Sequence, residues 1–341
     1  MHLARPRLMV LFNALYDQDV TSIPVRHPCE AIGELIRIEL DDRGEATIRF
    51  TQRANSYRDA RETIPAKFGE PAYKDLPDAE TYVRATVASG HVGFNNRDAI
   101  ESFIDRYGYP DLTAGHKPVV LGIDANIIPW RVPEVLDIDS ATGSRDAKDR
   151  APTNGYALAT GVKEELDWYY KQKHTRELTA VFSEEFARLD NQPAGANREG
   201  FLGLYEYRRL RTNRTVDIVE CETGDTAIVD GYKEFNETSR KRALLLSNDR
   251  GFVDQAVEAG VPAQHIAFPY ELPRKWTQAT ELRYYLAVLF GVVRLPKVTV
   301  YGVWNGKDGR HWQHEQLDIE CCSPKIEPQL ERDLSILDAI D

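Results

Sequence analysis

The sequence predicts an α/β protein whose central part is a three-layer sandwich around a parallel sheet. Two short, uninterrupted apolar runs, at 118–123 and 243–247, have the composition of strands that are buried on both faces. A third run at 265–268 follows a helical segment, 251–260. Because helical patterns separate the runs, strands alternate with helices, which is typical of a parallel sheet between two helical layers.

The residues before this sandwich form an N-terminal α+β region, 1–114, to which the sequence assigns no function. Its strand-like segments are 8–12, 34–40 and 45–50, and its helical segments are 79–89 and 96–108. A turn-rich stretch at 108–118 is interpreted as the linker to the sandwich, which spans 115–272.

The residues after the sandwich, 273–341, are predicted to form a C-terminal extension. Its most apolar stretch, 284–293, is about half the length that spans a bilayer, so a buried helix is expected there. Two strand-like segments joined by 305–310 predict a hairpin, and a polar helix is expected at 328–340.

Composition favours a soluble cytoplasmic protein without a membrane segment. The apolar run near the N-terminus has no small-residue cleavage site after it and is interpreted as a first strand. The four cysteines, Cys29, Cys221, Cys321 and Cys322, form no CxxC pair and are expected as thiols in a reducing compartment. The net charge of −11 means that any nucleic-acid binding must rely on a local basic patch and a metal site. Homo-oligomerisation is left open.

Two of the predicted strands run directly into aspartate, at Asp124 and Asp249. Ligands of open α/β sheets sit beyond the carboxyl ends of the strands, so both side chains are expected at one edge. The alternative for a single such aspartate is a cap on the next helix.

Helical periodicity adds two more acids to this edge. Glu165 lies about 60° from the apolar stripe of its helix, whereas Glu164 lies nearly opposite the stripe. Asp225 falls on the apolar side of a second helix, near its start, and Asp230 falls well off it. For Asp225 alone, a helix N-cap is the competing interpretation.

The four carboxylates, Asp124, Glu165, Asp225 and Asp249, together predict a divalent metal site. Gathering ionised carboxylates is costly unless a cation compensates their charge. Oxygen ligands favour Mg²⁺ or Mn²⁺, and one or two such ions can polarise a phosphodiester and activate water for its hydrolysis.

Four segments resemble the motifs of PIN-domain ribonucleases, in the same order. They are VVLGIDANIIP with Asp124, ATGVKEEL with Glu165, GDTAIVDGYKEF with Asp225 and ALLLSNDRGF with Asp249. The resemblance covers less than half the chain and implies a PIN-like fold and metal-dependent endonuclease cleavage of RNA. It also implies that the four acids are catalytic metal ligands, directly or through water. Asn126 and Ser247 would support them, and Asp230 would substitute if its helix were rotated.

The segment between the second and third acids is longer than in compact members of that family. It contains a basic and aromatic stretch at 205–214 that suggests a grip on single-stranded RNA, with Arg for phosphates and Tyr for base stacking. Its candidate contacts are Arg208, Arg209, Arg211, Arg214, Tyr205 and Tyr207. A solvated helix face with Arg paired to acids is the alternative.

Other functions remain to be weighed against the ribonuclease. An aspartyl-phosphate phosphatase needs a second aspartate where Asn126 stands, and the chain has neither a GxxxxGK[ST] loop nor a GxGxxG motif after its first strand. Two alternatives stay open: a non-catalytic RNA-binding or scaffold protein with a PIN-like fold, and a nuclease that uses the same site on DNA or branched structures.

Overall fold

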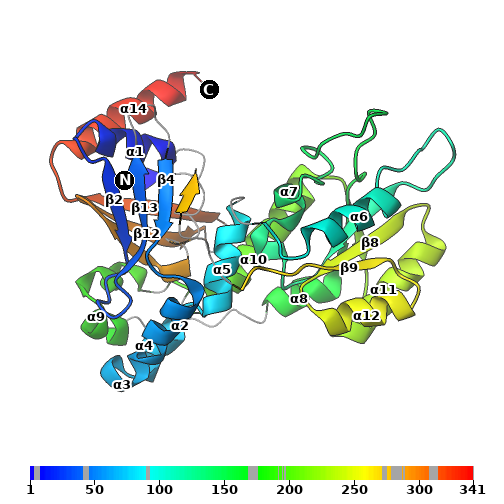
Figure 1. The fold of residues 1–341 in the computed structure, drawn as a ribbon, viewed down its shortest axis with the longest axis horizontal. Coiled ribbons are helices and arrows are strands. Elements are labelled where there is room, and N and C mark those ends of the chain that lie inside the picture. Colours follow the sequence, from blue (N-terminus) through cyan, green and yellow to red (C-terminus); the bar gives the residue numbers. More distant parts are fainter. Residues whose placement is uncertain are drawn as a thin grey trace. The chain divides into compact units, whose positions relative to one another are not determined.

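The computed structural model describes residues 1–3, 8–40, 46–89, 93–167, 176–190, 192–193, 195, 197–270, 275–277, 286, 289–306 and 314–340. The chain forms two compact units (Figure 1). The first unit combines Met1–Val92, Tyr170–Arg198 and Tyr270–Asp341, and the second combines Gly93–Tyr169 and Glu199–Pro269.

The second unit is built on a five-stranded sheet in which every pair of neighbours is parallel. Its order is β7-β6-β5-β8-β9, so β5, which comes first in the chain among these five strands, lies at the centre of the sheet. The strands are β5 (Val119–Ile123), β6 (Tyr156–Ala159), β7 (Val216–Val219), β8 (Arg242–Ser247) and β9 (Ala263–His265). The predicted α/β class and parallel sheet are confirmed.

Burial explains why the central strands read as continuous apolar runs. All residues of β5 and β6 are buried, as are all but the first of β8, so these strands have no face in water. The helices of this part of the chain are α6 (Arg97–Tyr107), α7 (Val132–Val135), α8 (Thr160–Asp167), α10 (Asn197–Asn213), α11 (Asp225–Thr238) and α12 (Arg250–Glu258), with the 3₁₀ turn η2 (Ile128–Trp130).

Gly122 brings one of these helices close to the sheet. A Cβ atom at Gly122 would lie 2.8 Å from the ring of Tyr232 on α11 and 2.3 Å from Leu245 on β8. The Tyr232 hydroxyl donates to the Ala157 carbonyl on β6, so its ring crosses the face of the sheet. The absence of a side chain at Gly122 therefore lets α11 pack tightly against three strands.

The first unit contains an eight-stranded antiparallel sheet of order β1-β13-β12-β11-β2-β3-β4-β10. Its strands are β1 (His2–Leu3), β2 (Ser22–Arg26), β3 (Glu34–Leu40), β4 (Ala46–Phe50), β10 (Lys275–Thr277), β11 (Val292–Leu295), β12 (Val298–Asn305) and β13 (His314–Cys321). Its helices are α1 (Leu8–Tyr16), α2 (Ala54–Glu62), α3 (Ile64–Phe68), α4 (Glu70–Asp75), α5 (Ala79–Ala88), α9 (Arg176–Val181) and α14 (Ile326–Ile340), with the 3₁₀ segment η3 (Glu184–Leu189).

This sheet divides the chain differently from the predicted boundaries at 114/115 and 272/273. Strands from both ends of the chain are paired in it: β1 with β13, β2 with β11 and β4 with β10. The N-terminal region and the C-terminal extension therefore share one sheet. The stretch 93–114, including α6 and most of the predicted linker, belongs to the second unit.

One local prediction in the first unit is wrong and another is right only in part. The apolar run 8–12 is part of helix α1 and not a strand. In the predicted buried helix 284–293, the described residues 286, 289 and 290 are helical and buried, but Val292 and Val293 belong to strand β11. Residues 284, 285, 287 and 288 lie outside the described residues. Both segments are short apolar runs, whose period does not separate helix from strand.

Other local predictions are confirmed. The strands at 34–40 and 45–50, the helices at 79–89 and 96–108, and the C-terminal helix are all present. The predicted hairpin is the β12–β13 pair, although 307–313 lie outside the described residues. The run 265–268 is strand only at His265, where β9 ends. Within the described part of the chain, no helix has the length and apolarity needed to cross a membrane.

Candidate functional site

The carboxyl ends of β5 and β8 are joined by a hydrogen bond between Ser247 and Asp124. These strands are parallel neighbours, and their register aligns Ile123 with Leu246. The side chain of Ser247 is fully buried, and its hydroxyl donates to Oδ2 of Asp124 over 2.5 Å. The Ala125 N–H donates to Oδ1 over 2.6 Å. Asp124 is thus fixed at the edge of the sheet by donors to both oxygens.

Asn126 reinforces this connection from the loop after β5. Its Nδ2 donates to the Ser247 hydroxyl over 3.3 Å, and its Oδ1 accepts the N–H of Asn248 over 3.1 Å. The Asp249 N–H donates to the same hydroxyl over 2.9 Å. Asn126 and Ser247, which the resemblance implies as supports of the acids, thus lie beside Asp124.

Glu165 reaches the same edge from α8, which begins directly after β6. Its Oε1 accepts the backbone N–H of Gly224 over 3.1 Å, at the start of α11. Glu165 is half-buried, whereas the neighbouring Glu164 is exposed. The prediction from helical periodicity is confirmed, and the two glutamates point to different surroundings on one helix.

Asp225 is the first residue of α11, after the loop that follows β7. The N-cap position is occupied by Gly224, and no side chain caps this helix. Asp225 lies inside the helix, after the N-cap, and therefore does not have the capping role that was its competing interpretation; its side chain is exposed. Its negative charge at the first helical position interacts favourably with the helix dipole.

Asp230 was expected to substitute as a ligand only if its helix were rotated, and that condition is not met. The buried residues of α11 are Ile228, Val229 and Tyr232, so the helix has the predicted rotation. Asp230 is exposed, because its position lies away from this buried stripe.

Asp249 is the N-cap of α12. Its Oδ1 accepts the N–H groups of Gly251 and Phe252, over 2.7 and 3.3 Å. The side chain is exposed at the end of β8. The helix that it caps is tied to α11 by a 2.8 Å hydrogen bond from Gln255 to the hydroxyl of Thr226. The N-terminal turn of α11 is thus linked to the middle of α12, the helix that Asp249 caps.

Electrostatics at this edge disfavour ionised carboxylates. Burial raises the pKa of Asp124 to about 6; the hydrogen bonds from Ser247 and Ala125 oppose the rise, and the charges of Glu165 and Asp225 add to it. Burial also raises the pKa of Glu165, against the hydrogen bond from the Gly224 N–H and together with the charge of Asp225. Three of the four predicted acids therefore affect one another.

The side chains nevertheless stand apart. Among the residues that the structure describes, no three His, Cys, Asp or Glu side chains are close enough to hold one metal ion. The fold places each acid after one of four neighbouring strands. Along the chain, β5, β6, β7 and β8 are followed by Asp124, Glu165, Asp225 and Asp249, and these four strands are adjacent in one parallel sheet.

The predicted RNA grip at 205–214 is largely used inside the protein. Tyr207 is buried, with 1% of its surface exposed, so the prediction that it stacks on bases is wrong. Arg209 pairs with Glu206 and, over 2.7 Å, with Glu134. Arg214 pairs with the fully buried Asp139 over 2.9 Å. Both side chains serve ion pairs, because α10 packs this face against its own unit.

The other members of the predicted grip are more accessible. Arg211 is exposed, and Tyr205 and Arg208 are partly exposed. They lie on the C-terminal half of α10, which leads into the amino end of β7. The carboxylates follow the opposite ends of the strands, so this stretch leads away from them.

Sequence reasoning missed two contributions to the site. Asn248 links β8 to the neighbouring strand, because its Nδ2 donates to the Ile266 carbonyl over 2.6 Å. Gly224 supplies the N–H that Glu165 accepts. Asn248 could have been found from its place between Ser247 and Asp249, whereas a backbone donor carries no sequence signal.

Comparison with models of known protein families, with curated proteins and with solved structures finds no match to this chain.

Proposed function

We propose that the chain is a cytoplasmic, Mg²⁺- or Mn²⁺-dependent endoribonuclease with a PIN-like three-layer sandwich. One observation carries the proposal: four acids, Asp124, Glu165, Asp225 and Asp249, follow four adjacent strands of a parallel sheet at one edge. That edge is where open α/β sheets bind their ligands. Chance placement of single acids at strand ends is common, but an acid after each of four neighbours is a pattern that metal-dependent hydrolysis uses.

The donor chemistry fits a hard divalent cation. All four side chains offer carboxylate oxygens, which suit Mg²⁺ and Mn²⁺. Burial, with smaller contributions from neighbouring carboxylates, raises the pKa of Asp124 and of Glu165, and a bound cation would favour their ionised forms. Binding requires Asp225 and Asp249 to turn toward Asp124, and both of these side chains are exposed.

The chain's own residues have separable roles in this proposal. Asp124 and Glu165 hold fixed positions through Ser247 and Gly224, whereas Asp225 and Asp249 complete the site from two helix N-termini. Asn126 positions Asp124 indirectly, by its bond to the Ser247 hydroxyl. A divalent ion bound among them would polarise the phosphodiester and lower the pKa of an attacking water.

The test is a cleavage assay with metal titration on single-stranded RNA, structured RNA and single-stranded DNA. RNA cleavage should require Mg²⁺ or Mn²⁺ and should be lost in Asp124→Asn. Asp225→Asn should lower the rate by at least about 100-fold, beyond the usual cost of losing a supporting residue. Asp230→Asn, on the same helix but exposed off the site, is the matched control and should leave the rate unchanged.

A second candidate is a non-catalytic RNA-binding or scaffold protein. It is favoured by the spacing of the carboxylates, since no three of the described acidic, His or Cys side chains lie within reach of one ion. RNA binding without cleavage, unchanged by Asp124→Asn, would support this candidate and contradict the nuclease. Cleavage of DNA alone would retain the chemistry and replace the substrate.

A further inference from the structure

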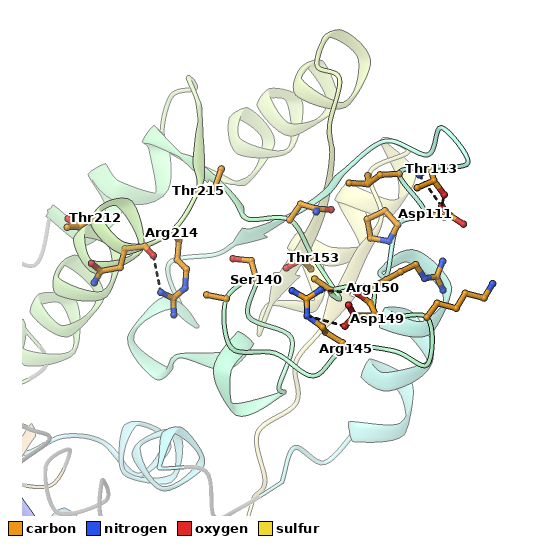
Figure 2. Close-up of a pocket in the computed structure, with 17 residues that line it drawn as sticks. Asp111, Thr113, Ser140, Arg145, Asp149, Arg150, Thr153, Thr212, Arg214 and Thr215 are labelled. Atoms are coloured by element: carbon orange, nitrogen blue, oxygen red, sulfur yellow. Dashed lines mark hydrogen bonds and ion pairs between the residues drawn. The ribbon is translucent and has the colours of Figure 1, made fainter.

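A polar cleft lies at the opposite edge of the five-stranded sheet from the carboxylates (Figure 2). Its walls come from residues before β5, the loop before β6 and residues before β7, namely 110–113, 140–154 and 212–215. All of them belong to the second unit. The cleft encloses about 930 Å³, which is within the range of sites for small molecules.

The cleft is basic in an otherwise acidic chain. Its lining includes Arg145, Lys148, Arg150 and Arg214, against only two acids, Asp111 and Asp149, whereas the whole chain carries a net charge of −11. Three of these cations have carboxylate partners, Arg145 with Asp149, Arg150 with Asp146 and Arg214 with Asp139. What the cleft offers to an anion is therefore Lys148 and those N–H donors of the arginines that the ion pairs leave over.

Internal ion pairs orient the loop that carries three of these cations. Asp146 accepts Nε and Nη2 of Arg150, over 2.8 and 2.6 Å, and also two backbone N–H groups of the loop. Arg145 donates through Nη1 to the Asp149 carbonyl over 2.9 Å. Nη1 of Arg150 and Nη2 of Arg145 have no partner among the described residues, so both guanidinium groups keep N–H donors for a ligand.

Lys148 lies between these two arginines in the loop. No described side chain or backbone group pairs with its ammonium group, which is exposed at the cleft. The two lining acids have partners of their own: the Asp111 Oδ1 accepts three donors from Thr113 and Ala114, and Asp149 lies 3.6 Å from Nε of Arg145 with 88% of its side chain exposed.

The other wall offers polar groups without partners. The hydroxyls of Ser140, Thr212 and Thr215 make no hydrogen bond with any described residue. The side-chain oxygen of Asn154 is buried and also has no partner among those residues. Figure 2 shows Thr212, Thr215 and Ser140 to one side of the arginine pair, so donors for an anion and polar groups for a second moiety occupy different parts of the cleft. Buried polar groups without partners are rare in folded proteins and often await a ligand or water.

We propose that this cleft binds a small phosphorylated ligand of nucleotide size. The phosphate lies against Arg145, Lys148 and Arg150, where guanidinium and ammonium donors match its oxygens. The sugar or base faces Thr212, Thr215 and Asn154. The cleft is separate from the carboxylates, so this proposal stands whether or not the chain is a nuclease.

The test is calorimetric titration of the full chain with ADP, inorganic pyrophosphate and adenosine, in EDTA so that metal at the carboxylates does not contribute. ADP should bind, pyrophosphate should bind more weakly, and adenosine should bind weakest. Arg145→Ala and Lys148→Ala should each weaken ADP binding by about tenfold or more, the cost of one charge-assisted hydrogen bond. Lys233→Ala, an exposed lysine of α11 outside the cleft, is the matched control and should bind as the wild type does.

Two further variants keep the result interpretable. Thr215→Trp fills the cleft at an exposed position without changing charge and should also abolish ADP binding. Asp124→Asn should leave ADP binding intact. The proposal would be overturned if ADP did not bind or if adenosine bound as tightly as ADP. It would also be overturned if Lys233→Ala weakened ADP binding as much as Lys148→Ala does. Binding of a 5′-phosphorylated RNA trinucleotide but not of ADP would overturn it too, and would assign the cleft to an RNA end.

Discussion

The Ser247 hydroxyl donates to Asp124 over 2.5 Å and links the carboxyl ends of two neighbouring parallel strands. The same oxygen accepts the Asp249 N–H and the Asn126 amide, over 2.9 and 3.3 Å. One buried side chain thus sets the positions of three residues that carry the proposed function. Because Ser247 is fully buried, no water can replace it without rearrangement.

Ser247→Ala should therefore reduce both metal affinity and stability. Removing a residue that orients a metal ligand costs about 10–100-fold in affinity or activity. The lost buried hydrogen bonds should cost about 1–3 kcal/mol in the free energy of unfolding. Calorimetric Mn²⁺ titration and urea unfolding of the same samples measure the two effects.

Two variants serve as controls for Ser247→Ala. Ser247→Thr keeps the hydroxyl and should recover metal affinity if the added methyl group is accommodated. Ser239→Ala removes a hydroxyl that accepts the Lys241 N–H in a turn at the other edge of the sheet, and should leave metal affinity unchanged. Wild-type Mn²⁺ affinity in Ser247→Ala would contradict the positioning role.

Glu165→Gln and Glu164→Gln form a matched pair on α8. The amide side chain introduced by Glu165→Gln would keep an oxygen for the Gly224 N–H, so the backbone contact at the start of α11 survives. Burial and the Asp225 charge raise the pKa of Glu165, which means that its ionised form is disfavoured in the folded protein. Without metal, Glu165→Gln should therefore not destabilise the chain, while its metal affinity and cleavage rate should fall.

The exposed Glu164 reports the effect of charge alone. Glu164→Gln should retain both metal affinity and cleavage rate, measured beside Glu165→Gln by Mn²⁺ titration and by cleavage of labelled RNA. Equal behaviour of the two variants would show that Glu165 is not a ligand and would leave the site with three acids.

A buried ion pair in the second unit should make its stability sensitive to the loss of either partner. Asp139 is fully buried and accepts Nε of Arg214 over 2.9 Å and the Tyr156 hydroxyl over 2.5 Å. Asp139→Asn should lower the free energy of unfolding by about 3 kcal/mol, since it removes the nearer of the two carboxylates that pair with Arg214, the other being Glu134 at 3.7 Å. Urea unfolding of Asp139→Asn, Arg214→Met and the double variant measures the coupling between the two residues. The double variant should lose less stability than the sum of the two single losses.

The Asp139 carboxylate also predicts that the free energy of unfolding decreases at acid pH, which forms the acid limb of the stability profile. Burial alone would raise the pKa of Asp139, but hydrogen bonds from Arg214 and Tyr156 outweigh it and hold the pKa well below the ordinary 3.8. The stabilisation is therefore complete above about pH 4 and is lost as pH falls below that value, because only the unfolded chain then takes up the proton. Asp139→Asn should flatten this limb, and an unchanged limb would assign it to other acids.

The sequence predicted the parallel sheet and its four acids because their signals are local. A strand buried on both faces is a continuous apolar run, and the acid after it needs no knowledge of distant residues. The rotation of α8 and α11 followed from helical periodicity, which separated the half-buried Glu165 from the exposed Glu164, whereas Asp225 and Asp230 are both exposed.

The antiparallel sheet was not predicted, because its pairing is not local. Leu3 lies opposite Leu317 and Arg26 opposite Arg294, and no pattern within either segment names its partner. The prediction of the RNA grip failed for a related reason. The sequence of a basic stretch does not show whether Tyr207 is exposed or buried, or whether Arg214 faces water or pairs with the buried Asp139. Tertiary packing decides between those outcomes.

A buried histidine in the first unit gives a further pH dependence. His27 has 2% of its surface exposed and lies against the rings of Phe182, Phe186 and Phe290. Its Nδ1 accepts the Cys29 N–H over 3.1 Å, and its Nε2 has no hydrogen-bond partner among the described residues. The ring is therefore held neutral, with its proton on Nε2.

Burial lowers the pKa of His27 from 6.5 to about 3, and the charges of Arg198 and Arg294 add to the shift. Between these values the unfolded chain binds a proton that the folded chain does not, so stability is complete above pH 6.5 and decreases as pH falls. The slope of the free energy of unfolding is about 1.4 kcal/mol per pH unit, or about 2 kcal/mol between about pH 6.5 and 5.

His27→Phe should remove that slope in urea unfolding at about pH 7.5 and 5.0. The loss of the Cys29 hydrogen bond costs the same stability at both pH values and does not affect the comparison. Parallel pH profiles for the wild type and the variant would mean that His27 is protonated in the folded protein, and the aromatic cluster around it would have to open to admit the charge.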